Sequence, residues 1–114
     1  MEDFKKDQDF IENEYGVAQI DMSRNVRCYC PLGKDWYSAK VTMTIRNMTV
    51  CTRIPNYCKV DEFISSLDGQ KLILEEVAYK VKSFLLELTN SEEHCIVVQV
   101  TSEDAVHLPV IITI

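Results

Sequence analysis

Between Trp36 and Ile45, apolar and polar residues alternate strictly with a period of two. The apolar positions are Tyr37, Ala39, Val41, Met43 and Ile45. The polar positions between them are Ser38, Lys40, Thr42 and Thr44. An extended strand turns every second side chain to the same side, so the pattern predicts a β-strand with one buried face and one solvated face. A sheet is therefore expected to form part of the fold.

A second alternation follows at once. Arg46 and Asn47 are predicted to make a tight turn, and residues 48–54 a second, antiparallel strand. Its alternating set is Met48, Val50, Thr52 and Ile54 against Thr49, Cys51 and Arg53. Pro55 is expected to end this strand, because proline has no N–H to donate to a neighbour.

Two helices are predicted next. Asp61 is the expected cap of a short helix that bears Phe63, Ile64 and Leu67 and that Asp68-Gly69 closes. A longer helix has an apolar stripe at spacings of three and four: Ile73, Val77, Val81, Phe84, Leu85 and Leu88. Such a stripe faces a core. Asn90 and Ser91 are expected to end the second helix.

Two further strands are predicted at residues 96–101 and 106–114, joined by a polar turn. The order strand, strand, helix, helix, strand, strand predicts an α+β fold, in which two helices cover one face of an antiparallel four-stranded sheet. The sheet has two open edges, whose unpaired N–H and C=O groups favour pairing with another copy. We therefore expect a homo-oligomer.

The chain has 114 residues, a length that supports one domain with a modest core. Residues 1–24 carry seven acids and three bases, a net charge of −4, and are predicted to form an acidic N-terminal arm or a short helix. Residues 25–114 are assigned to the domain. The whole chain has a net charge of −6, which argues against nucleic acid as a partner.

Composition also bears on the compartment. No apolar run approaches the roughly 20 residues that cross a bilayer, and the first residues contain no hydrophobic signal segment, so we expect no membrane association. The five cysteines are an odd number without a secretory context. Reduced thiols in the cytoplasm are the simplest interpretation.

The run Cys30-Pro31-Leu32-Gly33-Lys34-Asp35 stands immediately before the strand that begins at Trp36. Together with the order of the elements, it resembles the Cys-Pro loop of tunnelling-fold (T-fold) proteins, in particular the QueF-type nitrile reductases of queuosine biosynthesis, which act on 7-cyano-7-deazaguanine. The resemblance implies that Cys30 is a nucleophile and Asp35 an acid-base group. The loop here is two residues shorter than the usual form.

A second match lies at the start of the long helix, in Leu74-Glu75-Glu76-Val77. T-fold proteins place a glutamate or glutamine there, which holds the guanidine-like edge of a purine or pterin. The resemblance therefore implies that Glu75 anchors the ligand, while Leu74 replaces the family's histidine. Because Glu76 is the adjacent residue, the assignment of the anchoring glutamate stays open between Glu75 and Glu76. Trp36 and Tyr37 are candidates for stacking on the flat ring, although such aromatics more often belong to a strand core.

The chain departs from the nitrile reductases where they bind NADPH. Residues 60–64 read Val-Asp-Glu-Phe-Ile and contain no basic pair for the cofactor phosphate, so no cofactor is supported. Related archaeal amidinotransferases that act on modified tRNA also lack this motif and keep the thiol. The acidic balance of this chain makes tRNA an unfavourable substrate.

Zinc is the competing interpretation of the soft ligands, which are Cys28, Cys30, Cys51, Cys58, His94, Cys95 and His107. The T-fold GTP cyclohydrolases use Cys and His for zinc. No Cys-x-x-Cys pair exists here, and His94 and Cys95, as neighbours on a predicted strand, would point to opposite faces. The pattern therefore favours a site without metal.

Two functions remain open from the sequence. The first is an enzyme that binds a purine- or pterin-like heterocycle at a subunit interface and forms a covalent thioimide through Cys30. The second is a binding or assembly protein that keeps the scaffold without turnover. The missing cofactor motif favours the second, and the Cys-Pro loop favours the first.

Overall fold

The alternating segment forms a long strand at the centre of a sheet. A computed structural model describes residues 8–102 and 108–114, and in it β3 (Asp35–Ile45) pairs with β2 (Ile20–Cys30). The two strands form an antiparallel hairpin whose register runs from Ile20 opposite Ile45 to Cys30 opposite Asp35. The strand at 36–45 is thus confirmed, with a partner that precedes it in the chain.

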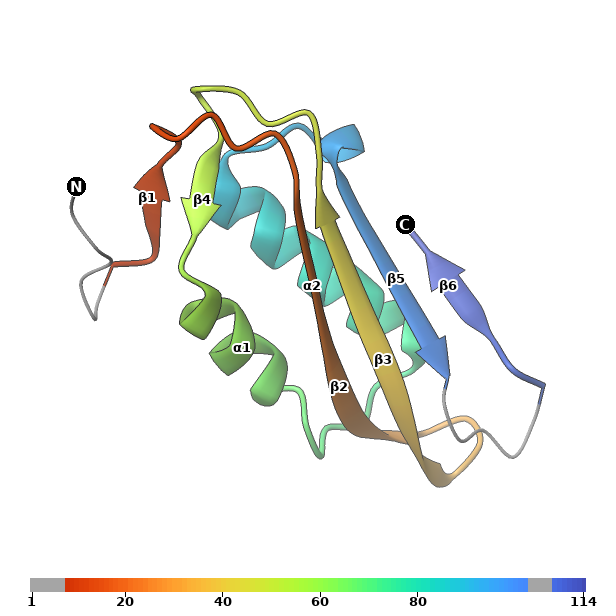
Figure 1. Cartoon of the computed structure of the whole chain (residues 1–114). Helices are drawn as coiled ribbons and strands as arrows, with labels where there is room; N and C mark the ends of the chain where they lie inside the picture. Colours follow the sequence, from red (N-terminus) through yellow and green to blue (C-terminus); the bar gives the residue numbers. More distant parts are fainter. Residues whose placement is uncertain (1–7, 103–107) are drawn as a thin grey trace.

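The other side of β3 carries the C-terminal strands. β5 (Ile96–Ser102) pairs with β3, and the short β6 (Ile111–Thr113) pairs with β5, so that the antiparallel order is β2-β3-β5-β6 (Figure 1). The strand predicted at 106–114 is shorter than expected, and Leu108 is exposed. Val106 and His107 lie outside the described residues.

The predicted strand at 48–54 is wrong. Asn47 has a φ of 54°, and the N–H of Met48 donates to Ala18 O over 3.0 Å, so the chain turns away from the sheet after β3. Val50, which the alternation placed in the core, is 78% exposed. Only Arg53–Pro55 is extended, as β4, and Pro55 is its last residue.

The short helix considered for residues 1–24 is also wrong within the described residues. β1 (Phe10–Glu12) pairs with β4 in a separate two-stranded sheet, and β2 begins at Ile20. The boundary drawn between residues 24 and 25 falls inside β2.

The two helices are confirmed, with a different first cap. α1 (Tyr57–Ser65) is capped by Asn56, whose side-chain oxygen accepts the Cys58 N–H at 3.0 Å. Asp61 instead lies within the helix and forms an ion pair with Arg24 at 2.6 Å. α2 (Leu74–Thr89) ends at Asn90, which is left-handed, as the sequence indicates. A short 3₁₀ turn, η1 (Glu93–Cys95), leads into β5.

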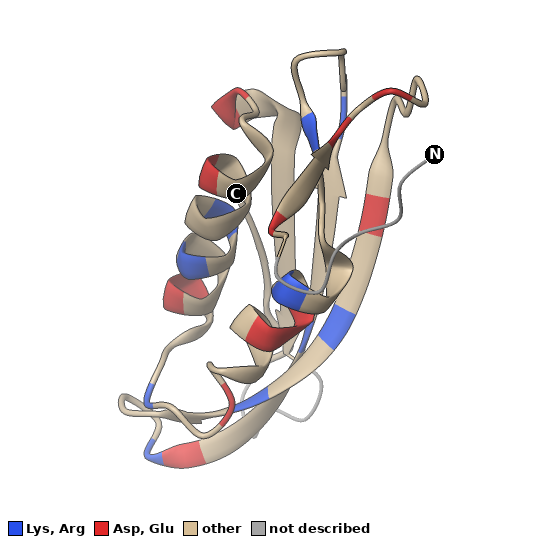
Figure 2. Cartoon of the chain, turned by 90° about the vertical axis from the view of Figure 1, so that its left-hand side faces the viewer, with Lys and Arg blue, Asp and Glu red and all other residues tan. Residues whose placement is uncertain are grey.

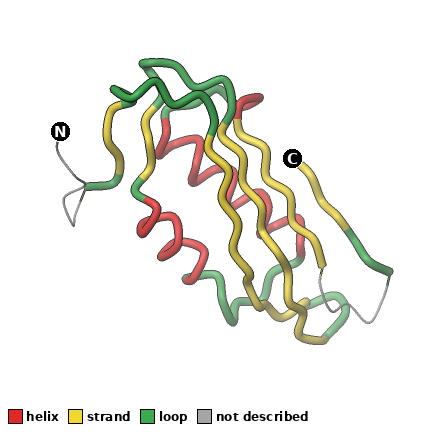
Figure 3. Tube along the Cα trace, viewed as in Figure 1, coloured by secondary structure: helices red, strands yellow, loops and turns green. Residues whose placement is uncertain are grey.

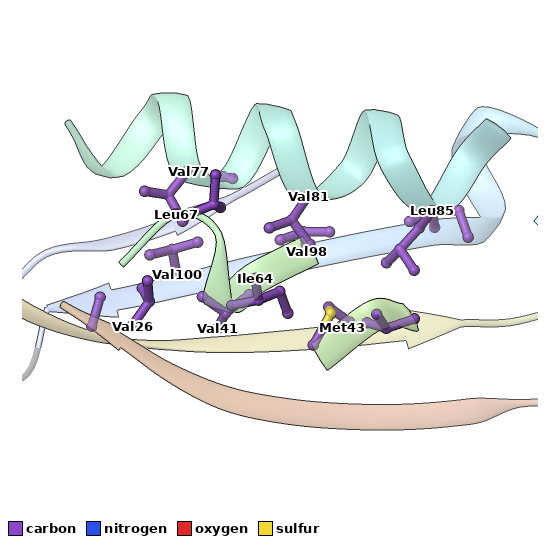
Figure 4. Packing of buried hydrophobic residues seen from close by; sticks show 14 of the residues in the cluster. Val26, Val41, Met43, Ile64, Leu67, Val77, Val81, Leu85, Val98 and Val100 are labelled. Carbon is purple, nitrogen blue, oxygen red and sulfur yellow. The ribbon is translucent and has the colours of Figure 1, made fainter. Parts of the chain in front are cut away.

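Both helices cover the same face of the four-stranded sheet (Figure 3). The predicted stripe of α2 supplies Val77, Val81 and Leu85 to this layer, and α1 supplies Ile64. Figure 4 shows them against the strand residues that point toward the helices, which are Val26, Val41, Met43, Val98 and Val100. The predicted ββααββ arrangement, an α+β fold with helices on one face, is therefore confirmed.

The opposite sheet face carries no helix and is largely polar. Its residues include Ser38, Thr42, Gln99 and Thr101, each partly buried or exposed. Acidic and basic residues are mixed along the helices that cover the other face (Figure 2). In the described part of the chain, neither helix combines the length and apolar character that a bilayer span requires.

Candidate functional site

The Cys-Pro loop is the turn of the long hairpin rather than a lead-in to the first strand. Cys30 is the last residue of β2, Asp35 is the first of β3, and the two stand opposite each other in the register. The Lys34 N–H donates to Cys30 O at 2.8 Å, and the Gly33 N–H donates to Cys30 Sγ at 3.3 Å. The turn therefore places a backbone N–H donor at the Cys30 sulfur.

Strand alternation separates the predicted site residues into two groups. Cys30 and Asp35 project toward the helix-covered side, as do Cys28 and Tyr37. Trp36 projects to the open side, where its ring meets Tyr29 edge-on at 5.5 Å. The hairpin end therefore brings Cys30 and Asp35 together and places Trp36 of the same copy on the other face.

The half-buried Cys30 and the exposed Asp35 differ in their surroundings. Asp35 Oδ1 accepts the N–H of Trp36 at 2.8 Å, so that one oxygen of this exposed carboxylate is used by the backbone of its own strand.

The segment between the helices lies along the outer edge of β2 and brings α2 to the hairpin. Gly69 N–H donates to Arg27 O at 2.8 Å, Tyr29 N–H donates to Gln70 O at 2.9 Å, and Leu72 N–H donates to Tyr29 O at 3.0 Å. These bonds fix residues 69–72, which we call the connector, beside the hairpin. The first turn of α2 follows directly.

Tyr37 is a residue of this region whose hydrogen bond the sequence did not indicate. It is buried, and its hydroxyl donates to Leu72 O in the connector. The sequence marked Tyr37 as a candidate for ring stacking or as a core aromatic. The one available signal for the hydrogen bond was the presence of a phenol where the later inward positions of the strand are aliphatic or thioether side chains, since a buried phenol requires a hydrogen-bond partner.

Two buried groups here have raised pKa values. Burial raises the pKa of the Cys28 thiol, whose sulfur lies 3.3 Å from Leu67 O. Burial also raises the pKa of Tyr37, and the neighbouring charges of Cys28, Cys30 and Glu76 act in the same direction. The ends of Cys30 and Glu76 therefore lie within electrostatic reach of the Tyr37 hydroxyl.

The two adjacent glutamates of α2 have different roles. Glu76 accepts the N–H of Ile73 at 3.2 Å and so closes the start of the helix. Glu75 is exposed and forms no hydrogen bond or ion pair with the described residues. Between the two, Glu75 has the carboxylate that is available for a ligand.

Glu75 and Cys30 lie on different sides of α2 within one copy. Helical spacing puts Glu75 on the flank with Lys82 and Leu86, whereas Lys80 and Phe84 lie on the flank facing α1. α1 contacts β2, the strand that ends in Cys30, and α2 contacts β5 and β6. Within one copy, the thiol therefore lies on the α1 side of the helix layer and the free carboxylate on the β6 side.

The alternative metal ligands are scattered. Among residues 8–102 and 108–114, no group of three or more His, Cys, Asp or Glu side chains is placed to hold a metal ion. His94 lies in η1 rather than on a strand, which corrects the expectation that it alternates with Cys95. His107 is outside the described residues.

The segment that should bind a nicotinamide phosphate lies inside α1. Residues 60–64 there contribute two carboxylates and no cation, and Asp61 is already paired with Arg24. These residues do not fit a dinucleotide phosphate, and the chemistry below contains no hydride step.

A cavity of about 590 Å³ lies elsewhere, between β1 and the two helices. Its walls are Asp9, Phe10, Lys59, Glu62, Phe63, Ser66, Phe84, Glu87 and Leu88. None of these is a predicted site residue, so this cavity belongs to a separate part of the surface.

Comparison with known proteins supports the fold. No model of a protein family matches the sequence, and no curated protein matches it. The structure is similar to one described as "Crystal structure of the archaeosine synthase QueF-Like in the apo form", with a TM-score of 0.68 and 15% identity over 87% of this chain and 93% of that chain. The chain therefore has the T-fold arrangement of this QueF-like structure.

Proposed function

We propose that the protein is a homo-oligomer that binds a planar purine- or pterin-like heterocycle where two copies meet. Cys30 of one copy attacks an electrophilic carbon of the ligand, and Glu75 of the next copy holds the guanidine-like edge. Asp35 supplies the proton. The observation that carries this proposal is the Cys30 thiol, half-buried in the hairpin turn with the Gly33 N–H donating to its sulfur at 3.3 Å.

Assembly through the sheet edges is consistent with the separation of Cys30 and Glu75 in one copy. On β2, the connector covers the edge at Arg27 and Tyr29. The outward backbone groups of Asp21 and Ser23 bond to nothing in residues 8–102 and 108–114. The flank of α2 that bears Glu75 faces β6, the other edge. Pairing of β6 with β2 of a neighbour brings that flank toward the neighbour's hairpin.

The chemistry requires only a thiol and a proton donor. With a nitrile ligand such as 7-cyano-7-deazaguanine, a bond forms between Cys30 Sγ and the nitrile carbon while one π bond of the C≡N group breaks. The electron pair moves to nitrogen, which takes a proton from Asp35, and the thiol proton is lost to solvent, which reprotonates Asp35. The product is a thioimide, and no oxidant or reductant is consumed.

Glu75 suits the anchoring role on physical grounds. A carboxylate accepts two parallel N–H bonds from a guanidine-like edge, each worth roughly 1.5–3 kcal/mol. Its place in the first turn of a helix stabilises the negative charge that these bonds need.

The test is adduct formation with 7-cyano-7-deazaguanine, followed by intact mass and by ultraviolet absorbance. The wild type is expected to gain the mass of one ligand per chain, and Cys30→Ala is expected to gain none. Glu75→Ala should weaken binding more than tenfold, since two charge-assisted bonds are lost. Glu87→Ala is the matched control, which removes an exposed carboxylate near the far end of the same helix and should leave binding within a few-fold.

The second candidate function is ligand binding without turnover. It is favoured by Asp35, whose carboxylate already accepts the Trp36 N–H and is exposed rather than enclosed with the thiol. Reversible binding that depends on Glu75, with no adduct on Cys30, would select this function. Absence of binding to any purine or pterin by the wild type would reject both.

A further inference from the structure

We infer that Tyr37 is a positioning residue, whose hydroxyl holds the first turn of α2, and with it Glu75, at a fixed place relative to the hairpin that carries Cys30. The inference deepens the proposed function and rests on it for the role of Glu75. The effect of the Tyr37 hydroxyl on the start of α2, through its hydrogen bond to Leu72 O, can be measured without a ligand.

The hairpin is the rigid half of this arrangement. β2 and β3 pair along their full length, and β5 pairs with the other side of β3. Tyr37 lies near the turn of the hairpin, opposite Cys28 and two residues from Asp35. A side chain that starts from Tyr37 therefore starts from a fixed backbone next to the thiol turn.

The connector is the adjustable half. Its backbone bonds to the sheet go to the outer edge of β2, through Arg27 and Tyr29, and the Gln70 N–H donates to Leu67 O at 3.1 Å. Leu72 is the last connector residue, and Ile73 after it is the N-cap of α2. The Tyr37 hydroxyl is the side chain of β3 that bonds to Leu72 O, across the buried layer between sheet and helix. This bond sets where α2 begins.

Hydrogen bonds within the first turn of α2 link the position of Leu72 to the position of Glu75. Ile73 N–H is held by Glu76, and Glu76 N–H and Val77 N–H return to Ile73 O at 3.1 and 3.2 Å. The first turn is thus bonded into one unit that moves with Leu72 and Ile73. Loss of the Tyr37 hydroxyl leaves Leu72 O without its buried donor and loosens this unit, while the packed turns after Val77 stay in place.

The ligand-free test is hydrogen exchange on Tyr37→Phe, which keeps the ring and its burial. Amides of residues 70–77 are expected to exchange about tenfold faster than in the wild type, since one buried hydrogen bond is lost. Amides of β2 and β3 should be unchanged, apart from that of Tyr29, which donates to Gln70 O in the connector. Tyr29→Phe is the matched control. It removes a hydroxyl from the open face, where the described residues offer it no hydrogen bond, and should alter neither region.

The second test separates positioning from general stability. For adduct formation with 7-cyano-7-deazaguanine, Tyr37→Phe should raise the half-saturating concentration about tenfold and change the limiting rate less than about threefold. In a Glu75→Ala background, Tyr37→Phe should add no further loss of affinity, because it acts through Glu75.

Equal exchange of residues 70–77 in the wild type and Tyr37→Phe, or additive losses of affinity in the double variant, would overturn the inference. Failure of the proposed function has a different signature, since the wild type would then bind no heterocycle. In that case faster exchange in Tyr37→Phe would still support the hold of the hydroxyl on α2. Urea unfolding of each variant confirms that the measurements are made on folded protein.

Discussion

At the scale of single residues, the buried layer under the hairpin contains two acids that the fold keeps neutral. Cys28 has an ordinary pKa of 9.0 and Tyr37 one of 10.0, and burial raises both. The folded state therefore retains protons that the unfolded chain loses above pH 9. The stability that these two groups contribute is complete below that pH and falls as the pH rises.

The first prediction concerns this alkaline loss. The free energy of unfolding should fall by up to about 4 kcal/mol between pH 8 and pH 11, because each group contributes up to about 1.4 kcal/mol per pH unit above its unfolded pKa. Urea titration with a reductant present measures it. Cys28→Ala should show a smaller fall across the same range. An unfolding free energy that is the same at pH 8 and pH 11 would contradict the prediction.

At the scale of the elements, the caps of α1 show what a local pattern misses. Asp61 is followed by an apolar pair and resembles a cap, yet the helix begins one turn earlier at Tyr57. The side chain of Asn56 serves both neighbours, since its oxygen accepts the Cys58 N–H and its nitrogen donates to Gln8 O at 2.8 Å. Asn56 thus joins the start of α1 to the segment before β1.

The second prediction compares these two residues. Asn56→Ala should lower the free energy of unfolding by about 1–2 kcal/mol, since it removes a cap and a buried hydrogen bond. Asp61→Ala removes only an ion pair at the surface and should cost less than about 1 kcal/mol. Chemical denaturation of the two variants measures both losses of unfolding free energy and shows which residue caps α1. A larger loss in Asp61→Ala would contradict the assignment.

The strands likewise show what a local sequence pattern does not predict. The sequence was sufficient to predict β3, α2 and β5, because their hydrophobic periodicity continues for two or more helical turns or strand pleats. It did not identify β2, because Arg24 stands at an inward position and interrupts the apolar alternation. The structure compensates that charge with Asp61 on α1, at 2.6 Å, which no local pattern reveals.

The candidate site was predictable only where the sequence is contiguous. Cys30 and Asp35 were found because they lie five positions apart along the chain, in one loop. The contact between Tyr37 and the connector was not found, since it joins residues 35 positions apart. Trp36 was grouped with the thiol by its nearness in sequence, although adjacent strand residues face opposite sides.

At the scale of the whole molecule, the open edge of β2 determines how copies can join. Connector bonds to Arg27 and Tyr29 show that odd-numbered residues of β2 turn their backbone groups outward. By the same alternation, the N–H of Ser23 faces outward and the N–H of Met22 faces β3. A change at Ser23 therefore affects pairing between copies, whereas a change at Met22 affects pairing with β3.

The third prediction uses this difference. Ser23→Pro should leave the chain folded and reduce the mass in solution toward 13.2 kDa, because proline is tolerated only where the N–H points away from the sheet. Met22→Pro removes a bond to β3 and should unfold the hairpin. Light scattering after gel filtration measures the mass, and circular dichroism reports folding. A wild type that is already 13.2 kDa would contradict assembly through this edge.

The placement of Trp36 has an optical consequence. It is the chain's single tryptophan, 46% exposed on the sheet face without helices, and the Arg27 guanidinium lies 5.9 Å from its ring centre. Its fluorescence therefore reports on the environment of that face. Dilution that separates copies in contact there should shift the emission to longer wavelength, whereas alkylation of Cys30 on the far side should scarcely change it.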